Sequence, residues 1–227
     1  MIPIRDTIPA RHTAWIVRGL VTLNVAVFLL ELSHGAALET FLYRFGIVPA
    51  YWDLTSPRDL LAWPRLALTF LTSQFLHGGL LHLGANMLFL WIFGDNVEDR
   101  LGHGRFLWLY LGSGLVAGLV QFAMQPSASV PMIGASGAIA GVLGAYFLLF
   151  PYARVLTLVP VFIVWKFIEL PAFVFLGLWF LLQWIQGMTT IGQVASAGGI
   201  AWWAHVGGFL TGLLTVLLTR RAWRRGE

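Results

Sequence analysis

Long apolar runs separated by short polar stretches dominate the chain. Each run is close to the length of about 20 residues that an α-helix needs to cross a hydrocarbon core of about 30 Å. The runs predict six membrane-crossing helices, at about residues 14–32, 80–96, 106–124, 136–150, 159–185 and 199–218. This pattern predicts an all-α polytopic membrane protein.

The segment between the first two runs, residues 33–79, has a different character. It is mixed in polarity and carries tryptophans and prolines, among them Trp52, Trp63, Pro57 and Pro64. Aromatic side chains favour the membrane–water interface, so short helices lying in that interface are expected here. We therefore expect a long first loop outside the membrane.

Composition supports the membrane assignment. Of 227 residues, 58% are hydrophobic and only 11% are charged, and the mean hydropathy is +0.79, far outside the range of soluble domains. Cysteine is absent, which excludes disulfides and Cys-based metal sites, whereas metal ligation by histidine alone stays open. We expect one membrane domain, residues 13–219, between a short tail, residues 1–12, and a basic tail, residues 220–227.

The arginines indicate topology. The net charge of +4 comes mostly from arginines at the ends of the apolar runs, so it is not read as a nucleic-acid-binding surface. With six crossings both termini lie on one side, and a cytoplasmic assignment satisfies the positive-inside rule. That assignment leaves three arginines outside, Arg44, Arg58 and Arg65, and puts nine inside: Arg5, Arg11, Arg100, Arg105, Arg154, Arg220, Arg221, Arg224 and Arg225. No targeting leader is expected from the first residues, which favours a bacterial inner membrane.

Three polar sites interrupt the apolar runs. In Gly134-Ala135-Ser136-Gly137 a hydroxyl stands at the first turn of an apolar helix. His82 and Asn86 are four residues apart and share one helix face, and His205 lies near the start of the last run. In the expected topology all three sites fall at one depth, one or two turns inside the outer end of their helices.

Each site also has a structural explanation. Gly137 and Gly141 form a small-xxx-small pair of the kind that packs membrane helices closely, and a lone His or Asn often joins two helices by a hydrogen bond. The shared depth favours contact between the sites. Histidine titrates near neutrality and is the natural base for a serine hydroxyl, so Ser136 and His205 are the candidate catalytic pair.

No catalytic carboxylate is expected to reach His205, which favours a Ser/His dyad over a triad. The free backbone amides at the start of the Ser136 helix, the Ser136 N–H among them, would stabilise an oxyanion together with side-chain donors. The chemistry implied is acyl transfer to Ser136 followed by hydrolysis.

These motifs together resemble the rhomboid intramembrane serine proteases over nearly the whole chain. Gly134-Ala135-Ser136-Gly137 is similar to the family's GxSG motif, and Ala204-His205-Val206-Gly207-Gly208 to the segment of its histidine. His82-Leu83-Gly84-Ala85-Asn86 resembles its HxxxN motif, Leu76-His77-Gly78-Gly79 the approach to that helix, and Trp63-Pro64-Arg65 a Trp-Arg element of the first loop, here with Pro64 interposed.

The resemblance implies a six-transmembrane-helix bundle in which Ser136 is the nucleophile, His205 the general base, and Asn86 and His82 oxyanion donors. It implies no cofactor and no metal, and single-span membrane proteins as substrates, cut near the outer membrane boundary. Where some members carry a tyrosine that stacks on the histidine, this chain has Ala140, so another group must orient His205. Substrate identity and oligomeric state stay open.

Two other functions remain. A catalytically inactive rhomboid-like protein would bind membrane clients without cutting them, and a small transporter would use the same polar residues to line a pathway. Within the expected fifth span, Lys166 and Glu169 could pair at i,i+3, and Pro171 is expected to kink the helix.

Overall fold

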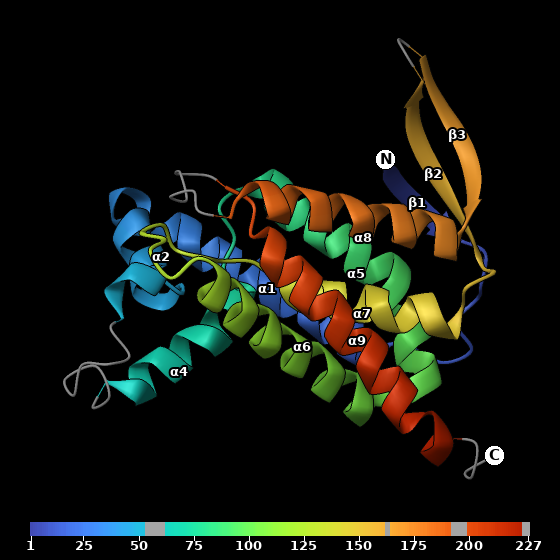
Figure 1. Cartoon of the computed structure of the whole chain (residues 1–227), viewed down its shortest axis with the longest axis horizontal. Helices are drawn as coiled ribbons and strands as arrows, with labels where there is room; N and C mark the ends of the chain where they lie inside the picture. The colour runs from blue at the N-terminus through green and yellow to red at the C-terminus, as the bar shows by residue number, and fades with distance from the viewer. Residues whose placement is uncertain (53–61, 162–163, 192–198, 224–227) are drawn as a thin grey trace.

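A computed structural model describes residues 1–52, 62–161, 164–191 and 199–223 (Figure 1). The chain is mostly helical. Its long apolar helices are α1 (Trp15–Ser33), α5 (Leu80–Leu101), α6 (His103–Met124), α7 (Ser136–Leu149), α8 (Ala172–Thr189) and α9 (Trp202–Trp223). Five helices of the described part, all of these except α7, are long and apolar enough to cross a membrane; α7 has 14 residues.

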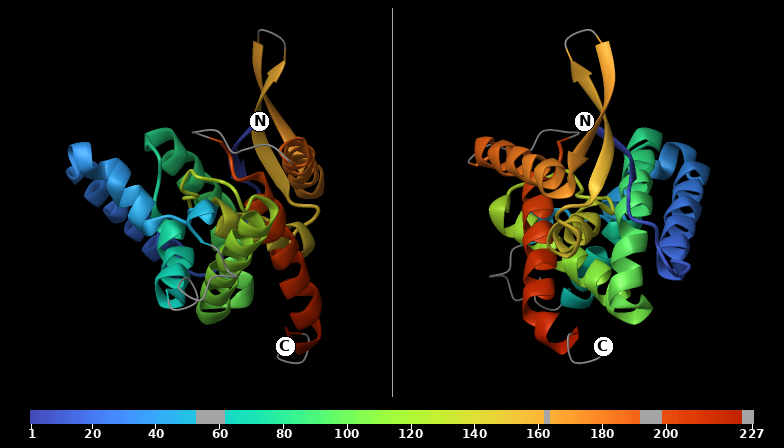
Figure 2. Two further views of the ribbon diagram at one scale, coloured as in Figure 1. Left: turned by 60° about the vertical axis from the view of Figure 1, so that its left-hand side comes forward. Right: turned by 90° about the vertical axis from the view of Figure 1, so that its right-hand side faces the viewer.

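Helix α7 is the centre of the bundle. Every residue from 137 to 146 is buried, and the end-on view in Figure 2 shows the other helices arranged around it. Glycines let α9 approach α7 until the backbones touch: a Cβ built on Gly208 would lie 2.0 Å from the Gly137 carbonyl oxygen, and one on Gly212 would lie 1.9 Å from that of Gly141. Small residues thus set the spacing of the two helices.

Acidic residues at the end of α5 complete the start of α1. The first amides of a helix lack intrahelical partners, and α1 has no side-chain cap of its own. The buried Glu98 carboxylate accepts hydrogen bonds from the backbone N–H groups of Ile16 (2.9 Å) and Val17 (2.8 Å), and Asp99 accepts those of Arg11 and His12. A carboxylate also suits the positive end of the helix dipole.

A three-stranded antiparallel sheet stands at one end of the bundle, the end at which both termini lie in Figure 1. Its central strand β2 (Arg154–Val161) pairs with β1 (Ile2–Asp6) on one side and with β3 (Val164–Pro171) on the other. The first residues, expected to be a tail, therefore include an ordered strand. Asp6 at its end accepts hydrogen bonds from Asn96 (2.8 Å) and from the Tyr146 hydroxyl, which ties the sheet to α5 and α7.

This sheet corrects the all-α prediction and the expected fifth span. Within 159–171 the described residues, 159–161 and 164–171, lie in the strands β2 and β3, and the helix of that region, α8, begins only at Ala172. Valines and aromatic residues favour strands here and Pro160 opposes a helix, but an apolar run alone does not separate the two structures. Pro171 precedes the helix and does not kink it. The expected pair was also wrong, because Lys166 and Glu169, three apart in a strand, point to opposite faces.

The segment between α1 and α5 contains short helices, as expected. They are η1 (Gly35–Ala37), α2 (Leu38–Phe45), η2 (Pro49–Tyr51), α4 (Trp63–Thr72) and η3 (Ser73–Phe75). An antiparallel bridge between Ile47 and Met132 joins this segment to the loop that precedes α7. Pro57 and Arg58 lie outside the described residues.

Candidate active site

The start of α7 and the start of α9 bring Ser136 and His205 together. His205 Nε2 lies 2.8 Å from Ser136 Oγ, a normal hydrogen-bond distance. Both residues are partly buried. The contact depends on the glycine packing of α7 against α9, because the two side chains stand at the same end of that pair.

The other ring nitrogen of His205 meets a residue of α8. His205 Nδ1 lies 2.7 Å from Gln183 Oε1, and Gln183 is buried at 7% exposure. The rings of Trp179 and Trp202 lie 5.7 and 6.3 Å from the imidazole, between centroids. Residues of α7, α8 and α9 therefore fix the position of this ring.

His82 lies beside the same site. A Cβ built on Gly134 would lie 2.7 Å from His82 Nε2 and 3.7 Å from Ser136 Oγ, so both side chains border the same small space. Gly134 has φ +124°, a conformation that favours glycine. The Gly78 N–H donates to His82 Nδ1 at 3.4 Å, a long bond. With Nδ1 as acceptor, Nε2 carries the proton and is a donor toward the serine.

Asn86 follows one turn after His82 on α5. Its side chain is buried at 6% exposure, and its Nδ2 has no hydrogen-bond partner among the described residues. Buried donors without a partner are rare and costly, so this amide is available to a ligand. The backbone N–H of Ser136, at the first turn of α7, is likewise free of an intrahelical partner.

A buried acidic residue holds the turn that leads into α5. Both carboxylate oxygens of Glu31 accept from the His77 backbone N–H, at 3.0 and 3.3 Å. Burial, with a smaller effect of His82, lowers the pKa of His77 to about 4, so this imidazole is neutral at physiological pH. Its ring packs edge-on against His82 at 5.1 Å.

The structure thus brings together the two predicted catalytic residues, with His82 adjacent and Asn86 on the same helix face. Sequence reasoning missed Gln183. A lone polar residue in the run Trp179-Phe180-Leu181-Leu182-Gln183 was a usable signal. The error in the fifth span hid it, since a helix over 159–185 places residue 183 at its very end.

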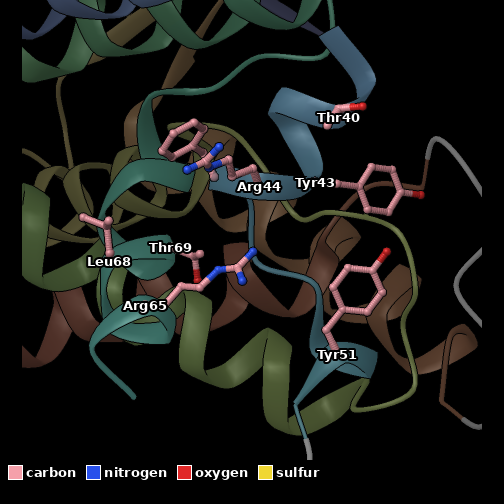
Figure 3. A pocket seen from close by; sticks show the side chains of 8 residues that line it. Thr40, Tyr43, Arg44, Tyr51, Arg65, Leu68 and Thr69 are labelled. Carbon is pink, nitrogen blue, oxygen red and sulfur yellow. The ribbon is translucent and has the colours of Figure 1, made fainter. Parts of the chain in front are cut away.

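The Trp63-Pro64-Arg65 segment has a separate position. Trp63 and Pro64 begin α4, and Arg65 lines a pocket of about 550 Å³ in the segment between α1 and α5, together with Arg44, Tyr43 and Tyr51 (Figure 3). None of the residues that line this pocket belongs to the Ser136 site. Arg65 is therefore not a member of that site.

Comparisons with known proteins all point to one family. The model of the Rhomboid domain matches residues 64–222. The rhomboid protease GluP of Bacillus subtilis is 40% identical over 121 residues, 52% of this chain and 21% of that protein. Rhomboid protein 1, mitochondrial, of Saccharomyces cerevisiae is 29% identical over 89% of this chain and 53% of its own length.

A human relative gives a similar result. The presenilin-associated rhomboid-like protein, mitochondrial, of Homo sapiens is 31% identical over 199 residues, which cover 87% of this chain and 46% of the relative. The chain thus matches about half or less of the length of these relatives. The first of these relatives comes from a bacterium, and the names of the other two assign them to mitochondria.

Proposed function

This chain belongs to the rhomboid family, and from that premise we propose that it is an intramembrane serine endopeptidase that works with a Ser136/His205 dyad. The observation that carries the proposal is the 2.8 Å contact from Ser136 Oγ to His205 Nε2. The second ring nitrogen faces an amide oxygen, which can only accept a hydrogen bond. Nδ1 therefore holds the ring proton, and Nε2 has the free lone pair that a general base needs.

In the first half of the reaction Ser136 Oγ attacks the carbonyl carbon of the scissile peptide bond while His205 Nε2 takes its proton. The tetrahedral intermediate then breaks its C–N bond. The amine leaves with the proton from the imidazolium, and the other product stays as an ester on Ser136. Water, deprotonated by the same nitrogen, attacks that ester and releases the acid and the free hydroxyl. No cofactor takes part.

The oxyanion of both intermediates needs donors on the other side of the carbonyl. Three are available: the Ser136 backbone N–H, His82 Nε2–H and Asn86 Nδ2. The unpartnered state of Asn86 supports this role, because the desolvation of the amide is then offset when the negative charge forms. One such donor contributes on the order of 10²–10³ in rate.

The proposed substrates are single-span membrane proteins cut near the outer membrane boundary. A peptide bond within a membrane helix is hydrogen-bonded and shielded, so the segment must unwind before Ser136 can reach it. Gly, Ala, Ser or Pro near the cut would suit a substrate, with Gly and Pro lowering the cost of unwinding most.

Sheet pairing supports six crossings with both termini on one side of the membrane, and the arginine distribution assigns that side to the cytoplasm. β1 precedes α1, β2 follows α7, and their pairing puts both strands on one side of the bilayer. Three crossings, by α1, α5 and α6, would separate them, so α7 must cross as well. Its 14 residues span about 21 Å, which leaves Ser136 roughly 9 Å below the outer edge of a 30 Å core. Location in a bacterial inner membrane stays a prediction from the sequence.

The test is cleavage of a model single-span substrate by the purified protein in liposomes. Ser136→Ala and His205→Ala should each abolish cleavage, whereas Ser33→Ala, an exposed serine of α1, should cleave at the original rate. A serine-directed fluorophosphonate should label the original protein and not Ser136→Ala. Binding of the substrate without cleavage or labelling would instead support an inactive client-binding protein. Cleavage by Ser136→Ala would refute the proposal.

A further inference from the structure

We propose that Gln183 is a positioning residue for the dyad: its side-chain oxygen holds His205 in the orientation and tautomer that the general base requires, and so makes catalysis depend on the position of α8. This inference rests on the proposed function of Ser136 and His205. It adds a residue of a third helix to that pair.

The geometry of the Gln183 amide is determined at both ends. Oε1 lies 2.7 Å from His205 Nδ1, and Nε2 donates to the backbone carbonyl oxygen of Trp179 at 3.3 Å. A reversed amide would put an NH₂ group against Nδ1 and an oxygen against a carbonyl oxygen, losing the second bond. The bond to Trp179 therefore selects the orientation in which the oxygen faces the imidazole.

This contact decides the tautomer of His205, and so whether the nitrogen beside Ser136 can act as a base. An amide oxygen accepts only, so Nδ1 must carry a hydrogen and Nε2 must be unprotonated in the neutral ring. The opposite tautomer would lose the bond to Gln183 and point an N–H at Ser136 Oγ, where it could not remove the proton. The group that would occupy this position in a triad is a carboxylate; here it is a neutral amide.

Other neighbours of the imidazole cannot replace this effect. Trp179 and Trp202 confine the plane of the ring but accept no hydrogen bond from Nδ1. Ala140, one turn after Ser136, offers only a methyl group. His82 is the titratable group of α5 near the ring and has no acidic oxygen. Among the described residues, Gln183 is the one hydrogen-bond acceptor that contacts Nδ1.

The helix that carries Gln183 is less buried in the protein than α9, the helix that carries His205. Of an 18-residue apolar stretch in each helix, 28% is buried in α8 and 44% in α9, and Leu178, Leu181, Leu182 and Ile185 are exposed. α7 and α9 are locked by backbone contact at glycines. A movement of α8 away from α9 would thus release Nδ1 while Ser136 and His205 keep their backbone positions.

The test compares Gln183→Leu, Gln183→Glu and the matched control Gln186→Leu, an exposed glutamine of the same helix. The rate of fluorophosphonate labelling of Ser136 is measured against pH, with KM and kcat for a model substrate and thermal unfolding as a check of folding. Gln183→Leu should lower the labelling rate and kcat by about 10- to 100-fold with little change in KM, and Gln186→Leu should match the original protein.

Gln183→Glu separates positioning from packing. A carboxylate accepts the same hydrogen bond and also stabilises an imidazolium, so it should restore most of the rate above neutral pH and move the acid-side half-maximal point to higher pH. A folded Gln183→Leu with the original rate would overturn the proposal, as would a Gln183→Glu as slow as Gln183→Leu at every pH. Failure of the proposed function would look different: the original protein and Ser136→Ala would then label equally.

Discussion

Replacing Gly208 by alanine tests whether the close approach of α7 and α9 sets the distance in the dyad. The added Cβ would lie 2.0 Å from the Gly137 carbonyl oxygen, whereas ordinary contacts begin near 3.4 Å. The backbones must therefore separate by about 1 Å or more, which would stretch the 2.8 Å contact between Ser136 and His205 to about 4 Å. A misplacement of about 1 Å costs on the order of 10²-fold in rate.

Stability should change in opposite directions in the variant and its control. In Gly112→Ala on α6, where no atom lies within 4 Å of the new Cβ, helix propensity should raise stability by up to about 1 kcal/mol. Gly208→Ala should lose about 1–3 kcal/mol through overpacking. Labelling by a fluorophosphonate and thermal unfolding in one detergent measure both effects. A folded Gly208→Ala protein with an unchanged labelling rate would refute the link between glycine packing and dyad geometry.

Three other changes test separate features. Glu98→Gln should lower the free energy of unfolding by about 2 kcal/mol, because the two α1 amides donate to different carboxylate oxygens and the NH₂ group that replaces one oxygen cannot accept; an unchanged value would contradict the capping role. The pKa of His77 falls from 6.5 to about 4 on folding, so the unfolded chain binds more protons between these values and stability should fall by up to about 3 kcal/mol as pH drops through that window. His77→Gln should flatten this dependence in unfolding curves taken at several pH values. Gly134→Ala should reduce labelling at least about 10-fold, since its φ and the nearby His82 leave no room for a Cβ; full activity would show that the loop adapts.

Periodicity and motif spacing could predict much of this molecule. Helices near α1, α5, α6, α7 and α9 follow directly from runs of apolar residues, and the proximity of Ser136 to His205 follows from their common depth in helices that run in one direction. The hairpin β2–β3 could not be read in the same way. A run of strand-forming residues is joined to the apolar helix α8, and the two charges near the junction, Lys166 and Glu169, are also compatible with a helix, so hydropathy alone merges the two.

The sequence marks Gln183 as a lone polar residue in an apolar run, but it does not show that its partner is His205. This contact depends on how α8 is rotated about its axis against α9, and packing among largely apolar surfaces leaves little periodic trace. Likewise, the capping of α1 by Glu98 joins residues far apart in the chain. In the sequence that carboxylate belongs to a charged turn and gives no sign that it is buried.

The pairing of β1 with β2 has a consequence for biosynthesis. Ile2 lies opposite Leu158, so the first strand leaves the ribosome about 150 residues before its partner, roughly 10–30 s at ordinary translation rates. Through that interval its backbone groups can bind only water or chaperones. The first amides of α1 also lack their acceptor, for a shorter time, until Glu98 has been synthesised. Final seating of the amino-terminal segment is thus a late event, and a ribosome stalled before residue 154 should leave these first residues open to protease.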